Sequence, residues 1–401
     1  MQLTLEEFKS DDIVSGEVHE KFAALKEEFE RNFSDREEVG ASLCVSVNGE
    51  RVADLWGGMA DPETNDPWQR DTVSTVFSCT KAATALCAHI LIERGQLDPV
   101  ALVSDYWPEY AKKGKEKTTV QMMLNHESAV PAFRDPVKKG GLNDWDYMIN
   151  RIEEEEAFWD VGTRNGYHMV SFGWTVGELV RRVSGKSLGT FFRDEVARPL
   201  GLDYWIGIGD AKPHIAPIII YVPTPEDMVT PFAQKLLTDP NSISHLSYLN
   251  TGEWSPNDSE SHKAEIGGAG GISNARSQVG MYEVLANGGE HGGVKLLSSD
   301  YIERMSRVST ATQIDATLLA PTRFASGFMK SMDNRAYPSG DWSSMRMGEA
   351  AFGHVGAGGS IGFADPQHNL AFSYTMNKMG SGLLMNERGQ SLIDKTYEIL
   401  S

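Results

Sequence analysis

The sequence predicts a mixed α/β fold of the α+β type, in which the two ends of the chain build one sheet around a helical insertion. Near the N-terminus, "SLCVSVNGERVADLWGG" alternates apolar and polar residues around Asn48 and Gly49, a strong signal for a two-residue hairpin. Near the C-terminus, strands are expected at 360–364 and 370–376, on either side of the turn "DPQHN". Between these strand regions, from about residue 100 to 270, helical patterns dominate.

Four helices and one unassigned segment complete the expected order. A helix is expected to open the fold because apolar residues recur at helical spacing: Val18, Phe22, Leu25, Phe29 and Phe33. A polar loop, "DPETNDPWQRD", leads into a long apolar helix that begins near Ser78 and ends at Gly95. Another helix ends at Gly185, and the last spans 392–400. The segment 205–266 holds several prolines and many polar residues, and its pattern favours no element.

Composition excludes several function classes. The chain has 401 residues, of which 40% are hydrophobic, enough for a sizeable core. Its net charge of −19 repels phosphate backbones and anionic lipids, so we expect neither a nucleic acid nor a membrane as partner. Cys44, Cys79 and Cys87 lack metal-ligand spacing and indicate free thiols. The N-terminal segment lacks a signal-peptide pattern, and we therefore expect a cytoplasmic location. The sequence specifies no oligomeric state.

Ser78 and Lys81 form the only S-x-x-K match in the chain. Positions i and i+3 lie on one face of a helix, so the hydroxyl and the amine can meet. Serine is a weak nucleophile until a base removes its proton, and a lysine can do so when burial lowers its pKa. The partial positive charge at a helix N-terminus also favours a developing alkoxide.

The simpler interpretation of Lys81 is a solvated charge on a helix face. The residues that follow leave little exposed face for it: Ala82, Ala83, Ala85, Leu86, Cys87, Ala88, Ile90, Leu91 and Ile92. A lysine buried among them needs a compensating role.

Four segments resemble one known superfamily, and they occur in its order. "FSCTKAATALCAHILIERGQLDPVALVSDYWPEYA" resembles the active-site helix of the serine β-lactamases and penicillin-binding proteins. "MMLNHESAVPAF" is similar to their L-x-x-H-x-S-G-L-P segment, and "GTRNGYHMVSFGWTVGELVRRVSGKSLGTFFRDEVARPLGL" to the stretch with the catalytic tyrosine. "FGHVGAGGSIGFADP" resembles the third motif, K-T-G, H-x-G or W-x-G. The resemblance is greatest to the family VIII carboxylesterases, relatives of the class C β-lactamases.

The resemblance implies a β-lactamase/transpeptidase-like fold, with an antiparallel sheet flanked by helices and a mostly helical lobe. Residues 1–70 together with 275–401 would form the sheet lobe. Residues 71–274 would form the helical lobe that carries Ser78, Lys81 and Tyr167. The site would lie between the two lobes.

The resemblance also assigns roles to residues of this sequence. Ser78 would be the nucleophile, with Lys81 and Tyr167 relaying its proton. The backbone N–H groups of Ser78 and Ala357 would form the oxyanion hole. A tyrosine on its own is more often a packing residue with a wet hydroxyl.

Three further positions would contact the substrate. His354 and Gly356 stand in the third motif, and His354 would line the site. Met169 replaces the asparagine of the family's Y-x-N, which removes a partner for a substrate amide.

Other motifs predict structural residues. Ser360 in "GGSIG" matches the G-x-S-x-G nucleophile elbow, but a strand and turn follow in place of the required helix. "SGKS", ending at Ser187, lacks the first glycine of a P-loop and indicates a helix end followed by an N-cap. His126 in "NHES" has no second histidine at zinc-binding spacing. No metal or other cofactor is expected.

We therefore predict a serine carboxylesterase that cleaves small-molecule esters through a Ser78 acyl-enzyme. Two enzymatic alternatives stay open: a β-lactamase or D-amino-acid peptidase, and an acyltransferase in which an alcohol or amine replaces water. A non-catalytic binding protein with the same fold is a third, and the intact set of Ser78, Lys81 and Tyr167 disfavours it.

Overall fold

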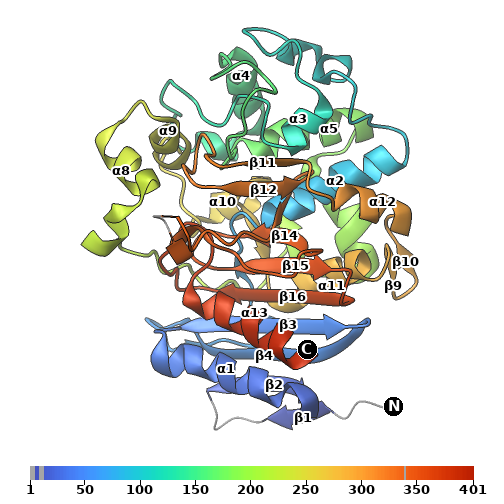
Figure 1. The fold of residues 1–401 in the computed structure, drawn as a ribbon, viewed down its shortest axis with the longest axis vertical. Coiled ribbons are helices and arrows are strands. Elements are labelled where there is room, and N and C mark those ends of the chain that lie inside the picture. Colours follow the sequence, from blue (N-terminus) through green and yellow to red (C-terminus); the bar gives the residue numbers. More distant parts are fainter. Residues whose placement is uncertain (1–4, 9–12, 338–339) are drawn as a thin grey trace.

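The computed structural model describes residues 5–8, 13–337 and 340–401, which are arranged around one large antiparallel sheet (Figure 1). The sheet has 11 strands in the order β1-β2-β4-β3-β16-β15-β14-β13-β12-β11, with β5 paired to β4. Its strands are β1 Leu5–Phe8, β2 Val14–His19, β3 Gly40–Val47, β4 Glu50–Asp61, β5 Asp66–Pro67, β11 Thr310–Thr312, β12 Thr322–Ala325, β13 Phe328–Lys330, β14 Phe352–Val355, β15 Ile361–Asp365 and β16 Leu370–Met376. β3 pairs directly with β16, which confirms that both chain ends build one sheet.

The two predicted hairpins are confirmed, and the predicted opening helix is partly wrong. Asn48 and Gly49 turn between β3 and β4 with φ of 54° and 76°, the left-handed backbone that a two-residue hairpin turn requires. Val18 belongs to β2, where buried and half-buried residues alternate, and the helix α1 begins at Ala23. The period-2 burial of the strand overrode the helical spacing read from Val18.

Helices cover both faces of the sheet. The bounds of the longer helices are α1 Ala23–Asp35, α2 Thr80–Glu93, α4 Trp145–Glu154, α5 Phe172–Ser184, α8 Pro231–Thr238, α11 Ala275–Ala286 and α13 Glu387–Leu400. α1 and α13 pack together, and α11 packs on β3, β15 and β16. Side chains of a strand alternate between faces, so Val45 joins the core with α1 while its neighbour Cys44 joins the core with α11.

In Figure 1, α4 and α5 lie above β11 and β12, and α2 lies to the right of β12. α2 packs on α5 and is buried on nearly every side, and Gly95 follows its end with φ of 70°. The shorter helices are α3 Val120–Leu124, α6 Leu188–Phe192, α7 Arg198–Leu200, α9 Ile243–Leu249, α10 Ser259–Lys263 and α12 Ser299–Met305. α8, α9 and α10 lie in the segment that the sequence pattern left unassigned.

Two small sheets complete the fold. One has the order β6-β8-β7 and the other pairs β9 with β10. Their strands are β6 Ser74–Thr75, β7 Tyr204–Ile206, β8 Gly271–Ser273, β9 Glu290–His291 and β10 Val294–Lys295. β6 stands just before Ser78, so this sheet ties the start of α2 to distant parts of the chain. The division into lobes at residues 70 and 275 stays a prediction.

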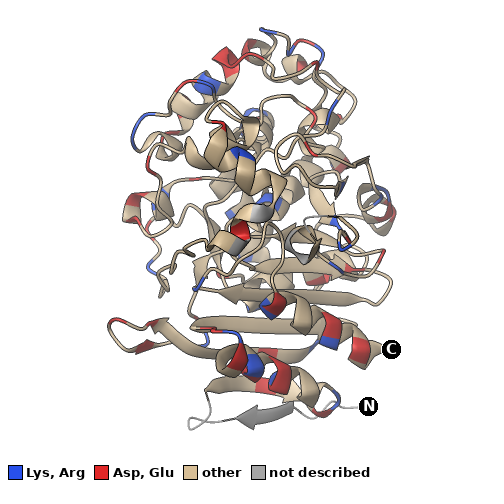
Figure 2. Cartoon of the chain, turned by 60° about the vertical axis from the view of Figure 1, so that its left-hand side comes forward, with Lys and Arg blue, Asp and Glu red and all other residues tan. Residues whose placement is uncertain are grey.

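The surface carries mixed charge. Residues of both charges lie along the helices near the C-terminal end in Figure 2. On α1 Lys26 pairs with Glu30, and on α13 Lys395 pairs with Glu398. Within the described ranges, no helix is both long and apolar enough to cross a bilayer.

Candidate active site

A pocket of about 400 Å³ lies between the start of α2, the turn after β14 and the α8–α9 segment. This volume falls in the range of small-molecule sites. Its polar members near α2 are Ser78 and the Tyr167 side chain. Its other walls are largely apolar: Phe77, Leu142, Met169, Val170, Met228, Phe232, Leu236, Tyr248, Trp254, Leu318, Met329, Leu383 and Leu384.

Ser78 stands at the entrance to α2, where the backbone exposes it to the pocket. It is the one partly exposed residue between Thr72 and Leu91. Phe77 before it has φ of 45°, a left-handed conformation that is costly for a bulky residue and that is common at functional sites. The Ser78 carbonyl accepts a hydrogen bond from the Lys81 N–H at 3.0 Å, which closes the first turn of the helix.

Lys81 is fully buried beneath Ser78, and its amine contacts three oxygens. Its Nζ lies 2.9 Å from the Ser78 hydroxyl, 2.6 Å from the Met169 carbonyl and 2.7 Å from the Gly268 carbonyl. Burial without a carboxylate partner lowers the pKa of Lys81 well below its ordinary value. The structure thus brings the two residues of the S-x-x-K match together.

Tyr167 approaches the same pair from a loop. Its side chain is buried, and the Lys81 amine lies 4.8 Å from the centre of its ring. Burial raises the pKa of the phenol, and a hydrogen bond with Ser78 acts in the opposite direction. The phenol is therefore protonated at neutral pH.

The two N–H groups expected to form an oxyanion hole share a distinctive environment. Ala357 follows β14 and is the one partly exposed residue between Ala351 and Asp365, as Ser78 is in its own segment. Within the described part of the chain, neither the Ser78 nor the Ala357 N–H donates to another protein group. Gly356 allows the turn after β14 to pack closely on the segment before Ser78, because a Cβ at Gly356 would lie 2.3 Å from the Val76 carbonyl oxygen.

His354 does not lie where it was expected to lie. His354 is fully buried and does not line the pocket; its ring packs 6.0 Å from that of Tyr167. Burial lowers the pKa of His354 to about 3, so its imidazole is neutral, and Nδ1–H donates to the Val355 carbonyl. Met169 does line the pocket, and its backbone carbonyl also accepts from Lys81.

Two more histidines surround Tyr167 from behind. The His126 ring lies 5.0 Å from the Tyr167 ring and accepts a hydrogen bond from the His168 N–H. His168 Nδ1–H donates to the Gly166 carbonyl, and its Nε2 accepts from the Ser128 hydroxyl. Burial lowers the pKa of both imidazoles, and that of His168 falls to about 3. His126 is therefore a packing residue below the site.

The residues predicted to be structural are placed accordingly. Ser360 is fully buried, and the Asp365–His368 pair lies at the other end of β15. Gly185 follows the end of α5, and the Ser187 hydroxyl caps α6 by accepting from the Thr190 N–H.

Sequence patterns missed Asp315 and the α8–α9 wall of the pocket. Asp315 is fully buried and accepts the Tyr167 backbone N–H. No motif marks it in "QIDATLL". Phe232 and Leu236 of α8 line the pocket from a segment without a recognisable pattern.

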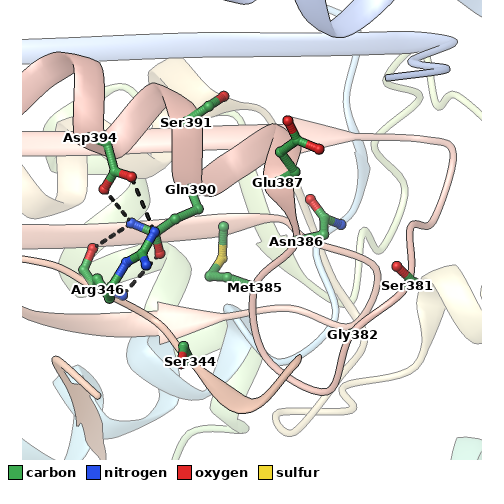
Figure 3. A pocket seen from close by; sticks show the side chains of 10 residues that line it. All are labelled: Ser344, Arg346, Ser381, Gly382, Met385, Asn386, Glu387, Gln390, Ser391 and Asp394. Atoms are coloured by element: carbon green, nitrogen blue, oxygen red, sulfur yellow. Dashed lines mark hydrogen bonds and ion pairs between the residues drawn. The ribbon is translucent and has the colours of Figure 1, made fainter. Parts of the chain in front are cut away.

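A second cavity, of about 460 Å³, lies beside α13 (Figure 3). Arg346 pairs with Asp394 at 3.2 Å at one side of it. The segment around Gly382 separates this cavity from the pocket at Ser78, since Gly382 lines both. None of the predicted site residues lines the second cavity. Among the described residues no group of three or more His, Cys, Asp or Glu side chains could hold a metal ion.

The fold and the site together define the class of protein. An antiparallel sheet is flanked by helices, and a serine and a lysine lie one turn apart at the start of a buried helix. The chain belongs to the β-lactamase family, whose model matches residues 27–394.

Proteins with esterase names are among those similar to this chain. The chain is 32% identical to "Esterase/beta-lactamase LipL" of Mycobacterium tuberculosis, over 93% of this chain and 85% of that protein. The chain is 33% identical to a family VIII carboxylesterase of known crystal structure, with a TM-score of 0.84. The match covers 96% of this chain and 99% of the carboxylesterase. A penicillin-binding protein homologue from Caulobacter crescentus is 31% identical, with a TM-score of 0.85 and the same coverage. The chain is thus a β-lactamase-like hydrolase whose relatives include esterases.

Proposed function

We propose that the protein is a serine carboxylesterase that hydrolyses small, uncharged esters through an acyl-enzyme on Ser78. The observation that carries the proposal is the partly exposed Ser78 hydroxyl in an apolar pocket, 2.9 Å from the buried Lys81 amine. A hydroxyl next to a base of lowered pKa is an activated nucleophile.

The protonation states support Lys81 as the base. A neutral amine has two N–H bonds and one lone pair. The two N–H bonds satisfy the Met169 and Gly268 carbonyls, and the lone pair then faces the Ser78 hydroxyl. A lysine–tyrosinate ion pair would place two charges in a buried site, whereas burial favours the neutral amine and the neutral phenol.

The reaction follows in two steps. Ser78 Oγ bonds to the ester carbonyl carbon as its proton moves to Lys81, and the Ser78 and Ala357 N–H groups hold the oxyanion. The oxyanion collapses, the bond to the alcohol oxygen breaks, and that oxygen takes a proton from Lys81 through Tyr167. Water then gives a proton to the same pair as its oxygen bonds to the acyl carbon. The bond between that carbon and Ser78 Oγ breaks, Oγ takes the proton back from Lys81, and the carboxylic acid leaves.

The charge of the pocket favours esters over β-lactams. Among the described residues that line it, Asp227 is the one charged side chain, so the carboxylate of a β-lactam would meet no cation from these residues. His354 cannot supply one, because it is buried, neutral and behind Tyr167. Buried polar partners provide most of the discrimination for polar substrate groups, and Met169 provides none for an amide.

The name of the LipL relative joins esterase with β-lactamase, which keeps β-lactams as candidate slow substrates. The test compares the specificity constants of the intact protein for a short-chain aryl ester and for a chromogenic cephalosporin. Mass spectrometry of peptides from each quenched reaction then locates any acyl group. We expect the ester to be turned over at least tenfold faster, with the acyl group on Ser78. A cephalosporin that matches the ester would support the β-lactamase alternative in its place.

A further inference from the structure

Asp315 is a fully buried carboxylate on the loop between β11 and β12, and its hydrogen bonds converge on the loop of Tyr167. Both of its oxygens lie 3.0 Å from the Tyr167 backbone nitrogen. Oδ1 also accepts the N–H groups of Thr317 at 2.8 Å and Leu318 at 2.9 Å. One carboxylate therefore fixes the backbone of Tyr167, the candidate proton relay, and the turn that carries Leu318, a residue of the pocket wall.

The surrounding contacts make this loop a junction. The Ala316 N–H donates to the Asn165 carbonyl at 3.0 Å, two residues before Tyr167. On the far side, the Ser244 hydroxyl of α9 donates to the Thr317 carbonyl at 2.6 Å. The segment 315–318 thus joins the Tyr167 loop to the α8–α9 wall of the pocket.

Burial of the Asp315 carboxylate is energetically unfavourable. Burial raises the pKa of Asp315 to about 6 even though backbone N–H groups and the Thr322 hydroxyl act in the opposite direction. A buried group that is maintained at such a cost, next to a candidate catalytic side chain, indicates a functional requirement for the geometry that it imposes.

We propose that Asp315 is a positioning residue for ester hydrolysis, which holds Tyr167 within reach of Ser78 and Lys81. The inference rests on the proposed function, because the role of Asp315 is exerted through the Tyr167 hydroxyl. A shift of about 1 Å in a catalytic group can cost on the order of 100-fold in rate. Loss of Asp315 should therefore reduce kcat more than it raises KM.

The chain offers a matched control in Asp365. It is also fully buried, and its Oδ1 accepts the N–H two residues along, Gln367, at 3.0 Å, as Oδ1 of Asp315 accepts that of Thr317. Its other oxygen binds Tyr397 of α13, and it does not line the pocket. D365A therefore removes an equivalent buried carboxylate without touching the Tyr167 loop.

The experiment measures kcat, KM and the folded fraction of D315A, D315N and D365A with an aryl ester. We expect D315A to lose about 10- to 100-fold in kcat, because it leaves the Tyr167 N–H without an acceptor. D315N should stay within about fivefold of wild type, since one amide oxygen can still accept from Tyr167, Thr317 and Leu318. D365A should keep its kcat per folded molecule.

Equal losses in D315A and D365A, or an unchanged kcat in D315A, would overturn the inference. If D315A does not fold, D315E replaces it, because a carboxylate one methylene longer displaces the same acceptor. Failure of both to fold, while D365A folds, would make the role structural and would also overturn it. The proposed function is judged separately, by wild-type turnover and by phosphonate labelling of Ser78.

Discussion

Ser78 beside Lys81 and Thr72 beside His214 each place a hydroxyl next to a base, and of these two hydroxyls only that of Ser78 faces a pocket. At the first, the Ser78 hydroxyl lies 2.9 Å from the Lys81 amine. At the second, the Thr72 hydroxyl lies 2.8 Å from His214 Nδ1, and His214 Nε2 lies 2.6 Å from Asp66. By connectivity alone, the second is the closer match to a hydroxyl–imidazole–carboxylate triad.

The surroundings of the two hydroxyls nevertheless favour Ser78 as the nucleophile. Thr72 is fully buried, and its oxygen also accepts the Gln69 N–H at 2.8 Å, so no substrate can reach it. Ser78 is partly exposed to a pocket, and neither its own N–H nor that of Ala357 donates to any described protein group. Its base is buried without a counter-ion, whereas about a third of the His214 and Asp66 side chains is exposed. Access and preorganised donors, rather than the hydrogen bond itself, distinguish a candidate site from a structural bridge.

Removing each hydroxyl is the strongest test of this contrast. S78A should lower kcat/KM for an aryl ester by at least about 1,000-fold, because the nucleophile is lost. T72V should leave kcat within about twofold and cost about 1–3 kcal/mol of stability, since it strands the Gln69 N–H. Ester kinetics and thermal unfolding measure the two effects. A serine-directed phosphonate that labels any peptide other than that of Ser78 would break the comparison.

The next effect concerns cooperation among the three side chains. K81A and Y167F should each lower kcat by about 100-fold or more, and the double variant should lose little beyond the worse single one, because members of one relay are not additive. The measurement is a double-mutant cycle on kcat. Losses that simply multiply would show that Lys81 and Tyr167 act independently.

A smaller effect is expected at the pocket wall, where two adjacent leucines serve as a matched pair. Leu236 lines the pocket, whereas Leu237 is 62% exposed. L236K should lower kcat/KM for an apolar ester by about tenfold and improve the relative rate of a carboxylate-bearing ester. L237K should change neither. Equal effects of the two variants, compared on both substrates, would show that this wall does not set specificity.

The smallest expected effect concerns how the free energy of unfolding changes with pH. The folded pKa of His354 is lowered to about 3, so the unfolded chain binds a proton there first as the pH falls below about 6.5. Its contribution to stability is therefore present above that pH and is lost toward pH 3. One site supplies at most about 1.4 kcal/mol per pH unit, and H354N should reduce the slope of acid destabilisation by up to that amount. Urea unfolding between pH 4 and 7 measures it, and an unchanged slope would contradict a neutral buried His354.

The sequence predicted much of the site because its signals are local. Ser78 and Lys81 are one turn apart, so any helix that begins near them brings them together. The hairpin at Asn48 and Gly49 was predictable for the same reason, since the turn geometry depends on those two residues. Burial of Lys81 also followed from the apolar residues around it.

Other features depended on contacts between distant segments. Val18 was misassigned because its pairing with Ala53 in β4 decides its conformation, and helical spacing carries no information about that partner. His354 was expected to line the site, yet the path of β14 turns it behind Tyr167. A motif gives the position of a residue along the chain but not the direction in which its strand faces the pocket.

Sequence patterns alone predicted the fold class and the order of the motifs along the chain. They also predicted the S-x-x-K pair, because its two residues lie one helical turn apart. Contacts between distant segments decided that a substrate can reach the Ser78 hydroxyl, that Asp315 holds the Tyr167 loop and that α8 lines the pocket. Those properties arise from burial and from hydrogen bonds between segments more than 100 residues apart. Tyr167 and Asp315, for example, are 148 residues apart in the sequence. Chain-entropy costs and packing gains balance over the whole molecule, and no local pattern of the sequence specifies them.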